Sequence, residues 1–147
     1  TKETKEMDAK DLAALLTGRD YGSEITREEE AQAKAAGLVV AFGASDDLLE
    51  FRGVVHDEIG CYGGGAATVD RKGVLPHFED IDRDDKDEMR DYFKREGGGI
   101  KVEACWEGEP SYSWIIKTSI PHHTFEVVED GEPYCRGVIF ALADLPT

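Results

Sequence analysis

The chain has 147 residues, of which 40% are hydrophobic, and a formal net charge of −15 at pH 7. This composition is typical of a folded protein, and the length suits one domain with a single core. So negative a chain is repelled by nucleic acid and by anionic membranes, and attracts basic proteins or cations. No apolar run is long enough to span a membrane. The three cysteines form neither a disulfide framework nor a metal motif, which indicates a reducing cytoplasm.

The first quarter of the chain is predicted to be helical after a frayed start at residues 1–7. Asp8 is a suitable N-cap for a short helix with three leucines on one face: Leu12, Leu15 and Leu16. A second helix over residues 27–36 begins with the capping box of Thr26 and Glu29. We expect its alanines on one face, Ala31 and Ala35, to pack against a sheet.

Most of the remaining chain is predicted to be β-strand. The apolar run Leu38–Phe42 indicates a buried strand, and in the next strand, residues 48–56, Leu49 and Phe51 alternate with Glu50 and Arg52. Further strands are expected at residues 66–69, 100–106, 112–118, 124–129 and 134–142. One more helix is predicted over residues 85–96, capped by Asp82 or Asp84, with a buried stripe of Met89, Tyr92 and Phe93. The predicted fold is one α+β domain, residues 1–147, with two or three helices packed on a predominantly antiparallel, twisted sheet.

No catalytic or metal-binding motif is complete in the sequence. Asp80, Asp82 and Asp84 have the spacing that opens a calcium-binding loop, but its sixth position is Asp85 instead of glycine. That stretch is better explained as a charged loop and helix cap. Walker, dinucleotide-binding and nucleophile-elbow motifs are also missing. We therefore assign no catalytic residue, no metal ligand and no cofactor.

The candidate binding residues are acidic, aromatic and histidine side chains near strand ends and on the C-terminal strands: Asp46, Asp47, Glu50, Asp57, Glu58, Tyr112, Trp114 and His122. The excess of acids falls on the predicted strands. Residues 37–65 carry five acids and one base, and residues 100–147 carry eight acids and three bases. Since carboxylates can replace phosphates in front of lysine and arginine, we expect an acidic recognition surface on the sheet and its hairpins.

Three stretches, residues 21–26, 37–53 and 133–142, resemble small uncharacterised acidic proteins encoded by bacteriophages and prophages. No functional motif accompanies this resemblance, so it transfers no site residue. It implies the cytoplasm of a bacterial host, where small acidic phage proteins often block defence systems.

The main hypothesis is a non-enzymatic inhibitor of phage type that binds a basic or nucleic-acid-binding host protein, for example as a DNA mimic. It predicts no direct contact with nucleic acid or membrane. One alternative is a protein that sequesters a nucleotide signal between the aromatic pair Tyr112 and Trp114 and polar groups at strand ends. The net negative charge opposes an anionic ligand unless Arg52 or Arg136 points into the pocket. A second alternative is a metal-dependent hydrolase that uses Asp, Glu and His side chains.

Overall fold

The computed structural model describes residues 7–45, 48–60, 64–76, 78–107 and 113–145. Its helices are α1 (Ala9–Leu16), α2 (Arg27–Ala35) and α3 (Lys86–Gly98), with 3-10 turns η1 (Phe78–Asp80) and η2 (Leu142–Asp144). Its strands are β1 (Arg19–Asp20), β2 (Leu38–Ser45), β3 (Leu48–Gly53), β4 (Asp57–Gly60), β5 (Gly64–Asp70), β6 (Gly73–Val74), β7 (Ile100–Glu107), β8 (Ser113–Thr118), β9 (His123–Glu129) and β10 (Glu132–Ala141). The predicted α+β class is confirmed.

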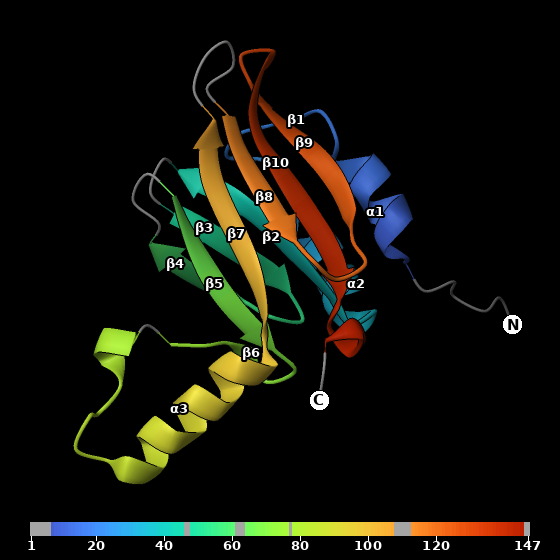
Figure 1. Ribbon diagram of the computed structural model, residues 1–147. Helices are drawn as coiled ribbons and strands as arrows, with labels where there is room; N and C mark the ends of the chain where they lie inside the picture. The colour runs from blue at the N-terminus through green and yellow to red at the C-terminus, as the bar shows by residue number, and fades with distance from the viewer. Residues whose placement is uncertain (1–6, 46–47, 61–63, 77, 108–112, 146–147) are drawn as a thin grey trace, which may run out of the picture.

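The ten described strands form one mixed sheet. Eight of them follow the order β4-β3-β2-β10-β8-β7-β5-β6, while β9 pairs with β10 and β1 pairs with β9. Two described pairings, β10 with β8 and β1 with β9, are parallel, and the others are antiparallel. The sheet branches at β10, because residues 135–136 pair with β8 and residues 138–141 pair with β2. It therefore curls into a nearly closed barrel, with β2, β3 and β4 behind β5, β7 and β8 in Figure 1.

Apolar side chains from both halves of the curled sheet form one buried cluster. Leu49 and Phe51 of β3 are fully buried, as their alternation with polar residues predicted. The run Leu38–Phe42 is buried throughout, which confirms the predicted strand. Each such side chain contributes about 1.5–3 kcal/mol when it is removed from water. This cluster holds β3 and β4 in place against the rest of the sheet.

Helices α1 and α2 start where the sequence predicted and pack on opposite parts of the sheet. Asp8 Oδ1 accepts the backbone N–H of Asp11 at 2.8 Å, and the capping box of Thr26 and Glu29 is formed in both directions. Helix α1 lies against β9 and β10, and α2 lies against β2 and β3. Among the residues described, no helix combines the length and the apolar character that crossing a membrane requires.

The third helix belongs to an arm, defined here as residues 78–98, which projects away from the sheet (Figure 1). No residue of α3 is buried. The aromatic residues predicted to face the sheet contact Phe78 instead, with ring centroids 5.7 Å away for Tyr92 and 6.1 Å away for Phe93. The N-cap of α3 is Asp85, whose Oδ1 accepts two backbone N–H groups, so the prediction of Asp82 or Asp84 was wrong by one or more residues.

Candidate functional site

A groove of about 700 Å³ lies between β4, β5 and the arm. It forms because β4 and β5, at or near the two ends of the strand order, approach each other when the sheet curls. Residues 57–60 of β4 line one side and residues 66–68 of β5 line the other. Apolar side chains complete it, among them Ile59, Leu75 and two rings of the arm, Phe78 and Tyr92. Its volume lies within the range of sites that hold a ligand or a peptide segment.

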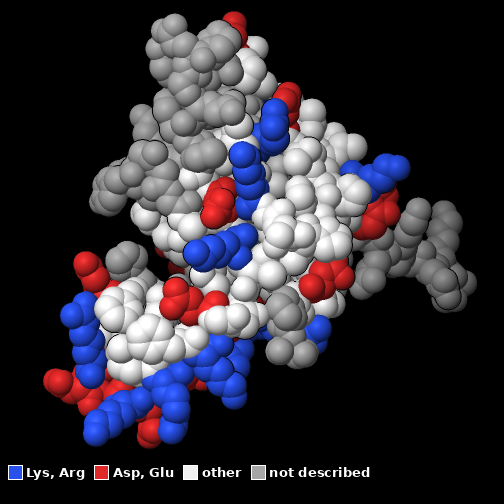
Figure 2. Space-filling view, viewed as in Figure 1, with Lys and Arg blue, Asp and Glu red and all other residues white. Residues whose placement is uncertain are grey.

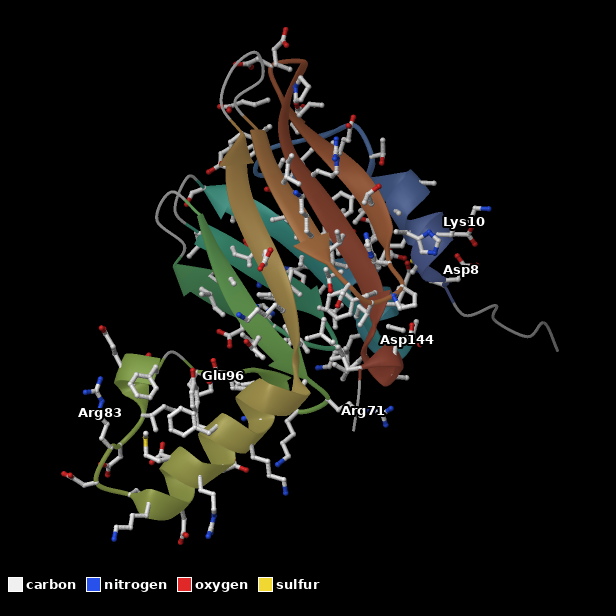
Figure 3. All side chains as sticks on the ribbon, in the orientation of Figure 1. Asp8, Lys10, Arg71, Arg83, Glu96 and Asp144 are labelled. Atoms are coloured by element: carbon white, nitrogen blue, oxygen red, sulfur yellow. The ribbon has the colours of Figure 1, made fainter. Side chains whose placement is uncertain are left out.

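The groove is acidic. Among the described residues, four carboxylates line it, those of Asp57, Glu58, Asp80 and Glu96, against the one ammonium group of Lys101. In Figure 3, Glu96 is on the side of α3 that faces the sheet, whereas Arg83 is on the outer side of the arm. Burial, and to a smaller extent the charge of Glu96, raises the pKa of Tyr92 above its usual value. In Figure 2, uncharged residues between the arm and the sheet are bordered by both acidic and basic ones.

Two of the predicted binding residues, Asp57 and Glu58, line this groove. Both are exposed on β4, and Asp57 Oδ1 accepts the backbone N–H of Glu58 at 2.8 Å. The carboxylates of Asp57 and Glu58 are therefore accessible to a partner. Asp46, Asp47 and Tyr112 lie outside the described residues, as does the side chain of Trp114.

Glu50 and His122, also predicted to bind, are placed elsewhere. Glu50 is only 8% exposed, and its carboxylate forms an ion pair with Arg52. Residues 21–25 lie against the face of the sheet that carries Glu50. Glu50 is therefore not available for contact with a partner at the surface. His122 is exposed in the turn between β8 and β9, where its Nδ1 lies 2.7 Å from the carbonyl oxygen of Ile120. It is not among the residues that line the groove.

A smaller pocket of about 310 Å³ lies under residues 21–25, and Glu24, Glu50 and Arg52 line it. Besides Glu50, Arg52 contacts the ring of His56, whose Nδ1 lies 2.9 Å from Glu30 Oε1. A continuous chain of contacts thus links Glu50 to Glu30 through Arg52 and His56. Arg52 is engaged within this network, whereas Arg136, the other arginine named by the nucleotide hypothesis, is exposed on β10.

The open face of β7, β8 and β10 carries both signs of charge (Figure 2). Exposed Glu103 and Lys117 are register partners, and so are exposed Arg136 and Glu126. Opposite charges at paired positions stabilise neighbouring strands and cancel each other. The predicted acidic surface therefore does not lie on this part of the sheet, and the groove is the better candidate.

Sequence reasoning missed the contribution of the arm. Phe78 belongs to no periodic pattern, and Tyr92 was assigned to the core because its helix is amphipathic. The stretch that resembles a calcium loop forms a turn, in which Asp82 Oδ1 accepts the backbone N–H of Asp84 at 3.0 Å. Within the described part of the chain, no three His, Cys, Asp or Glu side chains converge to hold a metal ion. No family model, curated protein or solved structure matches this chain.

Proposed function

We propose that this protein is a non-enzymatic binding protein, a single α+β domain, whose groove holds a basic surface of another protein. The observation that supports this proposal is the set of four carboxylates around an apolar groove that contains one lysine. Carboxylates accept charge-assisted hydrogen bonds from lysine and arginine, as phosphates do. The partner class is therefore a protein with a basic surface, such as a nucleic-acid-binding protein.

The groove combines the two features that a specific protein contact needs. Its apolar part, including Ile59, Leu75 and Phe78, supplies area that is removed from water, which is the main source of affinity. Its acidic rim, together with the net charge of −15, attracts a basic partner over a distance and excludes acidic ones. Both features are needed, because a charged surface alone would bind basic proteins without selection.

The setting that we propose is the cytoplasm of a bacterial host during phage infection, with a nucleic-acid-binding component of a defence system as the target. The resemblance of residues 21–26, 37–53 and 133–142 to phage-encoded proteins supports this setting. By occupying the basic surface, the protein would compete with DNA or RNA for it. Inhibition would then follow from competition and would require no chemistry.

The two alternative functions have less support. A nucleotide is anionic, and the carboxylates of Asp57, Glu58 and Glu96 repel it from the groove. A metal-dependent hydrolase needs converging ligands, and in the described ranges no group of three such side chains is present.

The proposal is tested by affinity capture of proteins from a bacterial lysate at about 50 mM and about 500 mM salt. The bait with a neutralised groove carries Asp57→Asn, Glu58→Gln, Asp80→Asn and Glu96→Gln. We expect the natural protein to retain nucleic-acid-binding proteins at low salt and to lose them at high salt. The neutralised bait should not retain them at either salt concentration.

The matched control removes the same charge elsewhere, with Glu126→Gln, Glu129→Gln, Glu132→Gln and Asp144→Asn, all exposed positions outside the groove. It should capture the same proteins as the natural chain. If both variants lose them equally, net charge alone is responsible and the groove is not the site. If the natural chain captures no nucleic-acid-binding protein at low salt, the proposed function is wrong.

A further inference from the structure

Two strand edges face the groove, and neither has a partner strand there in the described ranges. Strand β4 pairs only with β3, through residues 57–60. Strand β5 pairs with β7 along its length, but its other edge is covered only at residues 68–70, by β6 and by the N–H of Leu75. The groove is lined by residues 57–60 and 66–68, which belong to these two edges. The nearly closed barrel is therefore open where one more strand would fit.

The backbone of β5 presents hydrogen-bonding groups to this opening. The carbonyl oxygen of Thr68 accepts the N–H of Leu75 at 2.9 Å, so Thr68 directs its backbone groups away from β7. Because backbone groups alternate between the two edges of a strand, Ala66 and Gly64 direct theirs the same way. On that edge, no strand among the described residues pairs with β5 at Ala66 or Gly64. An unpaired edge of this kind is a template for an added strand.

We propose that the groove takes an extended, basic segment of a partner protein, which pairs as an added strand with the open edges of β4 and β5. This inference rests on the proposed function, because it assumes a basic partner. The segment in contact is short, since β4 has four residues and spans roughly 13 Å.

The residues around the groove set the pattern of the segment. Successive side chains of a strand point to opposite faces. On one face of the added strand lie half-buried Ile59 and buried Ala67, which favour apolar side chains. Around the opening lie Glu58, Asp80 and Glu96, which favour lysine or arginine. A segment in which basic and apolar residues alternate therefore fits best.

Two other occupants of the opening are disfavoured by charge. A second copy of this chain would bring a further net charge of −15 to an acidic groove, which opposes association through this surface. An acidic peptide is repelled for the same reason. A basic segment instead neutralises carboxylates that repel one another in the free protein. Its binding is therefore favoured by charge neutralisation and by backbone hydrogen bonds to the strand edges.

The test uses three labelled peptides of about seven residues. The first alternates lysine and valine, the second alternates glutamate and valine, and the third is the lysine peptide with alternate backbone nitrogens methylated on one edge. We expect the lysine peptide to bind, the glutamate peptide not to bind, and the methylated peptide to bind at least about tenfold more weakly, because it cannot donate hydrogen bonds from the methylated edge to one of the two strands. On binding, amide hydrogen exchange should slow in β4 and β5.

A protein variant tests the same edge from the other side. Ala66→Pro removes the N–H of Ala66, which points to the opening, whereas Ala66→Val keeps it. The proline variant should bind the lysine peptide at least about tenfold more weakly than the valine variant. If the proline variant does not fold, the methylated peptide decides the question alone.

The outcomes separate this inference from the proposed function. Equal binding of the methylated and unmethylated lysine peptides would overturn the added strand, while the proposed function would stand on the lysate capture. No binding of the lysine peptide would also overturn it. If the protein self-associates without peptide and amide hydrogen exchange in its β4 and β5 is then slow, a second copy occupies the opening. This result too would overturn the added strand of a basic partner. Loss of lysate capture by all baits would instead refute the proposed function.

Discussion

Among single residues, Arg19 and Glu29 form a partly buried electrostatic contact. Both oxygens of the Glu29 carboxylate accept hydrogen bonds from the Arg19 guanidinium, and Oε1 also accepts the N–H of Thr26 at 2.9 Å. Glu29 is only 8% exposed. The Arg19 hydrogen bonds, opposed by burial and assisted by Thr26, lower the pKa of Glu29 to about 2. The capping box was predictable from the spacing of Thr26 and Glu29, whereas the contact with Arg19 depends on how β1 meets α2.

We predict that Glu29→Gln lowers the free energy of unfolding at pH 7 by about 1–3 kcal/mol, because it removes the charge from a hydrogen-bonded pair. A carboxyl group with a lowered pKa stabilises the fold above its unfolded pKa of 4.5, and this contribution is lost as the pH falls toward about 2. The variant should therefore lose less stability than the natural protein between these pH values. Chemical denaturation at a series of pH values measures this.

The control for this prediction is Glu28→Gln, which removes one charge from the same helical turn at an exposed position. It should change stability by less than about 0.5 kcal/mol. If the natural protein and Glu29→Gln lose stability in parallel between pH 4.5 and pH 2, the ion pair does not stabilise the fold.

Among the elements, helix periodicity located each helix but predicted the buried face only in part. Leu12 and Leu16 of α1 are fully buried, but Leu15 is 48% exposed. Helix α2 buries Glu29 and Ala33 instead of Ala31 and Ala35. An alanine-rich helix has no distinct apolar face, so the contact with the sheet and the Arg19–Glu29 pair determine its orientation.

The arm shows a second limit of periodicity. Its amphipathic helix has no buried residue, and an ion pair joins it to β5: Arg95 Nε lies 2.6 Å from Asp70 Oδ2, and Arg95 Nη2 lies 2.9 Å from Oδ1. The hydrogen bonds from Arg95, opposed by burial, lower the pKa of Asp70. Phe93 is 54% exposed even though it faces Phe78. The position of one wall of the groove therefore depends on a contact between β5 and α3.

We predict that Arg95→Met speeds amide hydrogen exchange throughout α3 and leaves β2, β3 and β10 unchanged, because few other contacts hold the helix to the sheet. Lowering the pH of the natural protein below the ordinary Asp70 pKa of 3.8 should begin to have the same effect, since the stabilisation by a lowered pKa is lost as the group becomes protonated. Exchange followed by mass spectrometry tests both.

Arg90→Met serves as the control, because Arg90 pairs with Asp87 in an exposed i, i+3 position on the same helix. Exposed pairs of this kind contribute little to stability. Equal exchange rates in α3 for the two variants would show that the Asp70–Arg95 pair does not hold the arm.

At the scale of the whole molecule, the net charge of −15 opposes folding through repulsion between carboxylates. One such contact is at the tip of the β9–β10 hairpin, where Glu129 and Glu132 are register partners and both are exposed. The described ion pairs, such as Arg19–Glu29, act in the opposite direction but are few and partly shielded from solvent. Salt therefore screens more repulsion than attraction.

We predict that raising the salt concentration from about 20 mM to about 300 mM increases the melting temperature, because the screening length falls below the distance between most surface charges. The variant Glu129→Gln with Glu132→Gln removes one repulsive pair and should gain less from salt. Circular dichroism melting curves measure both. A melting temperature that falls with salt would show that attractive pairs dominate.

Local sequence patterns were enough to predict the α+β class, the two N-terminal caps, the buried strand Leu38–Phe42 and the inward side of β3. These features depend on residues a few positions apart, whose spacing in a helix or strand is known in advance. The placement of the groove, the burial of Glu50 and the projection of the arm were decided only by the tertiary structure. They depend on the branching of the sheet at β10 and on the approach of β4 to β5. The free energy of such long-range contacts is distributed over many residues that are far apart in the sequence, so no local sequence pattern predicts them.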